Sequence, residues 1–360
     1  MVTQYFIAMD VHCAFCEMAV MTATGRITQR KRINTTIPDL VAALEAVRRP
    51  KKLTFEEGPM ADWLTRNLAE HVDELIVCEP RRNGLIAKDS DKDDPIDAGK
   101  LADLFRGGYL KAVHQSQTLE RSLLKQHVSF YHDRVRERVR QGNQVLALLR
   151  RHGVFASSSQ LADTDDRDSL LARLPKSDLL RHDVQRLFQT YEFLCVQEDG
   201  IRKDLLEESR KHDVVRRFAQ LPGVGWIRAV TFFVYIDTPN RFAKKSTLWR
   251  YCGIGLERRR SGNGPTRVKL VSRGHRRLKN VLIGAAKSAI ASKTNPFADK
   301  YDSWRNEGLS PPTARRNVAR NIAVTLWSLW KSGREYDPRL VCRNSSLSRL
   351  SCASESIRPS

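Results

Sequence analysis

Short apolar runs separated by polar turns dominate the first hundred residues of this chain. They predict strands at residues 5–10, 16–24, 27–33, 52–56 and 74–78. Apolar residues spaced three and four apart predict helices over residues 37–48 and 61–71. Three early strands followed by alternating helix and strand predict an α/β sheet domain over residues 1–110.

A longer helical period governs the middle of the chain. From Leu124 to Leu149 and again from Leu180 to Leu205, apolar residues recur at three- and four-residue steps with charged residues between them. Two long helices that fold back on each other would form an antiparallel coiled-coil arm over residues 111–212. Residues 156–178 are rich in Ser and Asp, so we expect a linker between the two helices.

The last third of the chain is predicted to be mainly helical. Residues 221–225 (Leu-Pro-Gly-Val-Gly) separate two helical stretches and resemble the turn of a helix-hairpin-helix module, although Pro-Gly also marks ordinary turns. A further helix opens at Arg276. We therefore expect a basic helical domain over residues 213–340, followed by a Ser-rich tail (341–360) with a disordered composition.

Charge is distributed unevenly along the chain. The formal net charge is +21, yet residues 1–110 contain 15 basic and 17 acidic residues, which leaves 47 basic and 24 acidic residues in the remainder. This asymmetry indicates a catalytic module joined to a module that holds nucleic acid. A ribosomal or membrane-surface protein would also be basic, but neither would need the acidic cluster described next.

Residues 91–98 (Asp-Lys-Asp-Asp-Pro-Ile-Asp-Ala) form an acidic cluster at an expected helix start. Pro95 suits the first turn of a helix, and Asp94 and Asp97 are three residues apart, so their carboxylates share one helix face. A plain N-cap explains Asp94, and the positive helix end explains Asp97. Alternatively, both carboxylates bind a hard cation such as Mg²⁺, which needs further acids from elsewhere.

Two further acids follow predicted strands. Asp10 ends the first strand, and Glu56-Glu57 ends the strand over residues 52–56. Each alone is explained by an ordinary turn, but their order along the chain matches a nuclease fold that binds two metal ions. Glu56 follows Leu53-Thr54-Phe55 directly and is favoured as the second metal-binding acid. Strand alternation puts Glu57 on the face of Leu53 and Phe55, so Glu57 remains an alternative. His12 is expected to support Asp10 rather than to bind metal.

A basic block follows in the C-terminal third. Residues 241–279 contain 13 Lys and Arg and one acid, Glu257, together with several Gly. Such a block favours contact with phosphate over a merely solvated surface. The residues expected to contact nucleic acid are Arg258, Arg259, Arg260, Arg267, Lys269, Arg273, Arg276 and Arg277.

These motifs together resemble the DEDD transposases of the insertion-sequence 110 class, which are related to the Piv DNA invertase. The resemblance rests on Asp10 in an Ile-Ala-Met-Asp strand, residues 55–58, residues 92–98, the Leu-Pro-Gly-Val-Gly turn and residues 255–262 (Gly-Leu-Glu-Arg-Arg-Arg-Ser-Gly). It covers about residues 5–335. One departure is that residues 56–59 read Glu-Glu-Gly-Pro, where many relatives have Glu-x-(Thr/Ser)-Gly.

The resemblance implies a RuvC-like, RNase H-type N-terminal domain that binds Mg²⁺ (or Mn²⁺) through Asp10, Glu56, Asp94 and Asp97. It implies that Ser261 attacks DNA to give a covalent 5′-phosphoserine. It also implies a homo-oligomer (dimer or tetramer), DNA partners at the element ends and target, and a structured guide RNA. No neighbouring residue offers a base for Ser261, so a plain turn residue remains the alternative from the sequence itself.

Two other functions fit parts of the sequence. A junction-resolving nuclease would use the four acids and water without a covalent intermediate. A degenerate, non-catalytic DNA- or RNA-binding protein would keep only the basic block. The chain has no apolar window long enough to cross a membrane, no signal-like N-terminus and seven scattered Cys, so we expect a cytoplasmic, nucleoid-associated prokaryotic protein.

Overall fold

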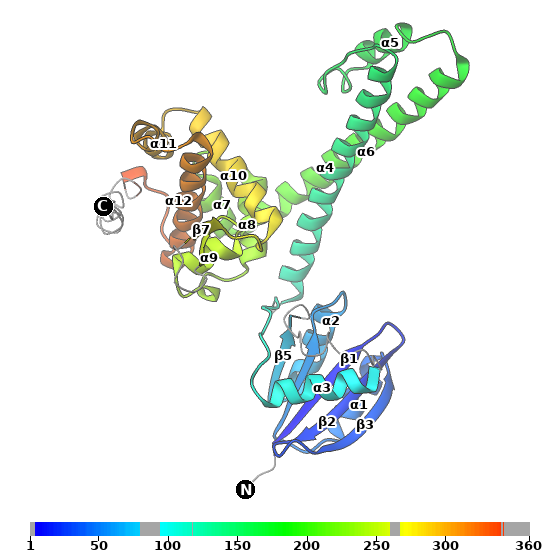
Figure 1. The fold of residues 1–360 in the computed structure, drawn as a ribbon, viewed down its shortest axis with the longest axis vertical. Helices are drawn as coiled ribbons and strands as arrows, with labels where there is room; N and C mark the ends of the chain where they lie inside the picture. The colour runs from blue at the N-terminus through cyan, green and yellow to red at the C-terminus, as the bar shows by residue number, and fades with distance from the viewer. Residues whose placement is uncertain (1–3, 80–93, 117, 260–266, 340, 342–360) are drawn as a thin grey trace. The chain divides into compact units, whose positions relative to one another are not determined.

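The computed structural model describes residues 4–79, 94–116, 118–259, 267–339 and 341 (Figure 1). Internal contacts divide the chain into two compact units, Met1–Ser122 and Leu123–Ser360. The division falls near the start of the long helix α4 (Leu119–Arg151).

The first unit is built on a five-stranded sheet in the order β3-β2-β1-β4-β5. Its strands are β1 (Tyr5–Val11), β2 (Phe15–Thr22), β3 (Ile27–Asn34), β4 (Lys51–Glu56) and β5 (Glu74–Cys78). The first three strands pair antiparallel, whereas β4 pairs parallel to both β1 and β5. The five strands predicted from the sequence are confirmed, and β1 is the central one.

Each face of this sheet is covered by its own helices. Ile7 and Met9 pack in the cluster formed with α1 (Ile37–Glu45) and α2 (Ala61–Leu68), and a short 3₁₀ turn (Ala69–His71) follows α2. Ala8 packs on the opposite side with α3 (Asp94–Arg106), which Figure 1 shows lying across the sheet. Because neighbouring strand residues point to opposite faces, β1 is buried on both sides.

In the second unit, α4 and α6 (Asp178–Arg210) form a pair of long helices (Figure 1). The Arg138 Nε donates to Glu198 Oε2 at 2.5 Å and so joins them. The segment expected to be a linker differs from the prediction, because it contains α5 (Thr164–Ala172). Asp163 caps this helix, and Leu170 is buried in the cluster at the end of the pair.

The rest of the second unit contains α8 (Gly225–Ile236), which is buried from Ala229 to its end. A helix that is apolar on all sides must lie inside the fold. An antiparallel hairpin that the sequence analysis did not predict joins this helical part. The hairpin consists of β6 (Leu256–Arg259) and β7 (Arg267–Leu270). The other elements of this helical part are α7 (Asp213–Ala219), a 3₁₀ turn (Pro239–Arg241), α9 (Lys245–Tyr251), α10 (Arg276–Ala291), α11 (Pro296–Asn306) and α12 (Pro311–Ser332).

Among the described residues, no helix has the length and apolar character needed to cross a membrane. The tail predicted to be disordered (341–360) lies outside the described residues except for Val341, which is buried.

Candidate active site

The parallel pairing of β1 and β4 brings two predicted acids to the same edge of the sheet. Met9 of β1 is in register with Phe55 of β4. The next residue in each strand is an acid, so Asp10 and Glu56 lie beside each other near the carboxyl ends of the strands.

Strand alternation assigns both acids to one face. Met9 and Phe55 pack together in the cluster with α1 and α2, while Ala8 packs in the cluster with α3. Asp10 and Glu56 have the parity of Ala8 and therefore lie on the face that α3 covers.

The two candidate acids at the end of β4 are placed differently. Glu56 is half-buried and is the last residue of the strand, whereas Glu57 is exposed. The backbone N–H of Glu57 donates to the Cys78 carbonyl at 2.8 Å, which continues the pairing with β5. This geometry favours Glu56 as the acid next to Asp10.

Helix α3 carries the second pair of acids. Ala98 and Leu101 are buried against the sheet, and Asp97 immediately precedes Ala98 and is half-buried. Asp94 is the first residue of the helix, and its side chain lies outside the described part of the chain. The sequence prediction of a helix start at the acidic cluster is confirmed, since α3 begins at Asp94.

One oxygen of the Asp97 carboxylate lacks a hydrogen-bond partner among the described residues. This oxygen, Oδ1, is buried. A buried carboxylate oxygen without a partner is costly, and a hard divalent cation with oxygen ligands is the partner that removes this cost. The donor set of Asp10, Glu56, Asp94 and Asp97 consists of carboxylates, which fits Mg²⁺ or Mn²⁺.

Two neighbours of Asp10 complete this edge of the sheet. His12 Nε2 lies 3.1 Å from Asp10 Oδ2, as expected for a supporting residue. Glu17 of β2 is in register with Asp10, is 5% exposed and pairs with Arg32 at 2.5 Å. Glu17 was not predicted from the sequence, because only the β1–β2 register places it beside Asp10.

The predicted nucleic-acid-binding residues are spread over the hairpin and the start of α10. Arg259 is in register with Arg267, and the segment that joins them contains Arg260 and Ser261. That segment lies outside the described residues, as do the side chains of Arg258, Arg259 and Arg267. The described side chains that are exposed are Lys269, Arg273 and Arg276.

Arg277 is held within the fold. Its guanidinium donates to Asp133 Oδ1 at 2.6 Å, to the Tyr235 hydroxyl at 2.5 Å and to the Ser129 hydroxyl. These contacts join α10 to α4 and α8. Its predicted role in nucleic-acid binding therefore has to be combined with a structural one.

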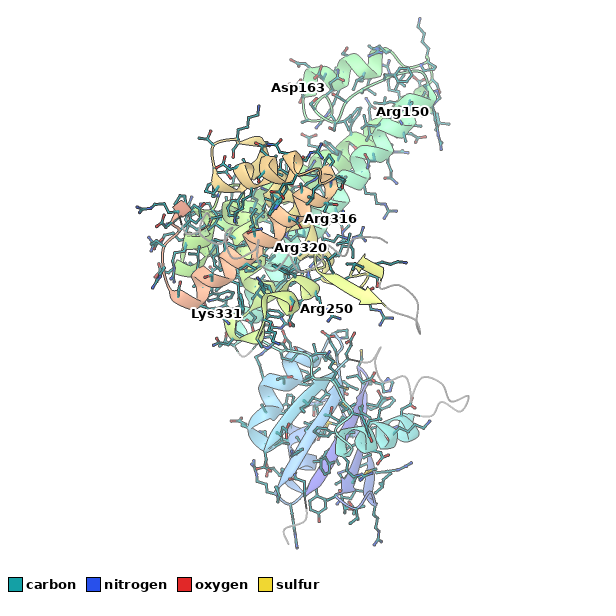
Figure 2. All side chains as sticks on the ribbon, turned by 60° about the vertical axis from the view of Figure 1, so that its left-hand side comes forward. Arg150, Asp163, Arg250, Arg316, Arg320 and Lys331 are labelled. Atoms are coloured by element: carbon teal, nitrogen blue, oxygen red, sulfur yellow. The ribbon has the colours of Figure 1, made fainter. Side chains whose placement is uncertain are left out.

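Helix α12 carries further arginines, outside the basic block of residues 241–279. Figure 2 shows Arg316 and Arg320 on this helix. The Arg320 Nε donates to the Ile254 carbonyl at 2.7 Å, just before β6. Burial, together with the nearby Arg316, lowers the pKa of Arg320. These two arginines are four residues apart in the sequence, and this spacing places them on one face of a helix, which predicts a basic helix face.

Glycines of the basic block serve packing. A Cβ on Gly274 would lie 2.4 Å from Gly253 Cα, so the turn before β6 and the turn before α10 touch through their backbones. A Cβ on Gly223 would lie 2.2 Å from the Ala285 carbonyl of α10. Close approach to another segment of this chain therefore explains these two glycines, and the structure shows Leu221–Gly225 as a turn packed on α10.

Comparisons with known families give two matches. Residues 7–154 match a family described as Transposase (DEDD_Tnp_IS110), and residues 215–302 match the Transposase IS116/IS110/IS902 family. The first match contains the acidic edge of the sheet, and the second contains the turn at 221–225 and the hairpin.

Individual relatives are distant. "Putative transposase y4pF/y4sB" of Sinorhizobium fredii is 22% identical over 253 residues, which are 68% of this chain and 64% of the relative. The transposase for insertion sequence element IS1111A of Coxiella burnetii is 21% identical over 247 residues, 67% of each chain. The transposase for insertion sequence element IS1328 of Yersinia enterocolitica is 24% identical over 158 residues, 42% of this chain and 46% of the relative. The similarity thus spans slightly less than two thirds of the first of these relatives.

Proposed function

Because the chain belongs to the IS110 class of DEDD transposases, we propose that it excises and inserts its own insertion sequence by phosphoryl transfer through Ser261. The N-terminal unit would be the RuvC-like, RNase H-type catalytic domain, and the C-terminal unit would hold DNA. The proposed nucleic-acid contacts are those of the basic hairpin and of the start of α10.

The convergence of the acids carries this proposal. Parallel register puts Asp10 beside Glu56, and α3 brings Asp97 to the same face with a buried oxygen that lacks a hydrogen-bond partner among the described residues. Asp10, Glu56, Asp94 and Asp97 would hold Mg²⁺, which supplies charge stabilisation for attacking and leaving oxygens. The placement of several acids at one half-buried edge supports a metal site there.

Ser261 would act as the nucleophile. Its Oγ would attack the DNA phosphorus, so that the Oγ–P bond forms, the P–O3′ bond breaks and the 3′ oxygen takes up a proton. The serine loses its own proton in this step and becomes a 5′-phosphoserine. Attack by a 3′ hydroxyl of another strand would then break the Oγ–P bond, restore the serine and join the strands.

A trapping assay tests this function. Full-length protein, Mg²⁺, labelled DNA carrying the ends of the element and its flanking RNA would be separated on a denaturing gel, beside Ser261→Ala and Asp97→Asn. We expect a slowly migrating protein–DNA adduct with the unmutated protein and none with either variant.

Other outcomes select the alternatives. Cleavage without an adduct that survives Ser261→Ala would mean a metal-dependent junction nuclease using water. Binding without cleavage in every sample would mean a non-catalytic binding protein.

We also propose a structured guide RNA and a homo-oligomer (dimer or tetramer) as partners. The strongly basic remainder of the chain, residues 111–360, supports an RNA partner, because its basic residues outnumber its acidic residues by 23. Omitting the RNA from the trapping assay should abolish the adduct. Light scattering of the purified protein should give a mass of two or four times the 41.1 kDa of one chain.

A further inference from the structure

A cavity of about 1020 Å³ lies between α4, α6, α8 and α10 in the second unit. Arg276 and Arg277 of the basic block line one side of it, and none of its described lining residues lies on the hairpin. Ligand pockets commonly have about 300–1,000 Å³, so this cavity has room for a nucleotide-sized group.

The lining of this cavity is strongly basic. Five arginines contribute to it, and among its described lining residues none is acidic. Three of the five lie outside the basic block, on α4, α6 and α8. The arginines are Arg136, Arg202, Arg228, Arg276 and Arg277.

Two of these arginines are half-buried, and Arg228 is the one that has no acidic partner among the described residues, since Arg277 pairs with Asp133. Arg228 donates to the Gly223 carbonyl at 2.6 Å and to Ser288 Oγ at 3.0 Å, both neutral acceptors. No described carboxylate pairs with Arg228, and burial lowers the pKa of its guanidinium. Gly284 leaves space for the guanidinium, since a Cβ there would lie 3.3 Å from Arg228 Nη2. A partly buried cation without a counter-ion favours the binding of an anion.

The neighbouring groups do not supply that anion. Asp133 is already shared by Arg277, at 2.6 Å, and by Arg136. His132 is neutral at physiological pH, because burial and Arg277 lower its pKa to about 4. The cavity therefore keeps a net positive charge within the described protein.

The cavity also offers an aromatic surface. Trp226, in the first turn of α8, lines it together with Tyr131 of α4. Gly225 begins α8 in open space, and no side chain caps this helix end. Aromatic rings beside cationic groups are how proteins hold an unstacked base and its phosphate.

We propose that this cavity binds an unpaired nucleotide of a nucleic-acid strand, with its phosphate on Arg228, Arg202 and Arg276 and its base against Trp226. This inference rests on the proposed function, since it names a second contact for the nucleic acid. A base-paired nucleotide would not fit, because its faces are covered by stacking within the duplex.

Binding without metal tests the proposal. Fluorescence anisotropy of full-length protein in EDTA would be measured with single-stranded DNA, RNA of the same sequence and duplex DNA, across a salt series. Arg228→Gln and the exposed pair Arg202→Gln/Arg276→Gln should each weaken single-strand binding about tenfold and reduce the salt slope by about 0.7 per lost phosphate contact. Comparison of the affinities for single-stranded DNA and for RNA of the same sequence shows which of the two the site prefers.

Matched variants separate binding from folding. Arg228→Lys should retain most of the affinity, whereas Arg186→Gln, on the same helix as Arg202 but about 24 Å away, should have no effect. Trp226→Leu should weaken binding to strands with intact bases about tenfold. On a strand that lacks the base, this variant and the unmutated protein should bind with equal affinity. Circular dichroism verifies the fold of each variant.

Equal affinity of the unmutated protein, Arg228→Gln and the Arg202→Gln/Arg276→Gln pair would overturn the proposal. Strand cleavage is not part of this assay, so failure of the serine chemistry would leave its outcome unchanged. Conversely, an active transposase with unaffected pocket variants would refute only the pocket.

Discussion

At the scale of single residues, the half-buried Asp97, with its buried Oδ1, links stability to metal binding. Its Oδ1 has no hydrogen-bond partner among the described residues, so a bound cation would supply the missing interaction. This separates Asp97 from Asp133, whose charge is compensated by arginines.

Replacing Asp97 by Asn should therefore leave the metal-free protein as stable as the unmutated one or more stable. In the unmutated protein, Mg²⁺ at a hundred times its Kd should add about 2.7 kcal/mol to the free energy of unfolding, and Asp97→Asn should lose this gain. Adduct formation should fall by about a hundredfold or more. Thermal unfolding with and without Mg²⁺ measures the first two effects, and Asp103→Asn, an exposed change on the same helix, is the control. An equal Mg²⁺ response in both variants would contradict the assignment.

Two histidines of the second unit should make its stability depend on pH. Burial, with Arg277 as the next cause, lowers the pKa of both His132 and His275 from 6.5 to about 4. Between these values the unfolded chain binds protons that the folded protein excludes, so stability falls as the pH drops from about 6.5 to about 4. Urea unfolding at several pH values should show this loss. It should be smaller in His132→Gln/His275→Asn and unchanged in the control His182→Gln, an exposed histidine.

At the scale of elements, the turn between α7 and α8 is fixed by its contact with α10. Gly223 has φ of +79°, and its missing side chain lets the turn approach the Ala285 carbonyl. The same turn places Arg228, which donates to the Gly223 carbonyl at 2.6 Å. A disturbance of this contact should reach the cavity through Arg228.

Gly223→Ala should lower the free energy of unfolding by about 3 kcal/mol or more, because a Cβ would collide with backbone in a left-handed conformation. Gly200→Ala is the matched control: it lies on α6 with open space around it, and it should stabilise the helix by about 0.5–1 kcal/mol. Denaturant unfolding of the two variants measures both values. Equal stability of the two would show that the α10 contact is loose in solution.

At the scale of the whole molecule, the charge asymmetry coincides with the division into units. The acids of the candidate metal site all lie in Met1–Ser122, whereas the basic hairpin, the α12 arginines and the cavity lie in Leu123–Ser360. Each unit has its own hydrophobic core. Metal binding and nucleic-acid binding should therefore stabilise different parts of the chain.

Calorimetry should show two unfolding transitions. Mg²⁺ should raise the midpoint of one, and a single-stranded oligonucleotide in EDTA should raise the midpoint of the other, because each ligand stabilises the unit that binds it. A single transition shifted equally by both ligands would mean that the two units unfold as one.

The sequence by itself determined the elements and the candidate chemistry. Strand alternation and helical spacing are local properties, so the five strands, α3 and the long helices α4 and α6 were predicted near their observed bounds. The order of Asp10, Glu56, Asp94 and Asp97 along the chain was sufficient to indicate a metal site and a family resemblance.

Only the tertiary structure decided which groups meet. The parallel register placed Glu56, rather than Glu57, on the face of Asp10, and it revealed Glu17 as their neighbour. Packing on α10 explained Gly223, and the folding of four helices around one cavity left Arg228 without an acidic partner among the described residues. Contacts between residues distant in sequence depend on register and packing, and no local pattern in the chain encodes these.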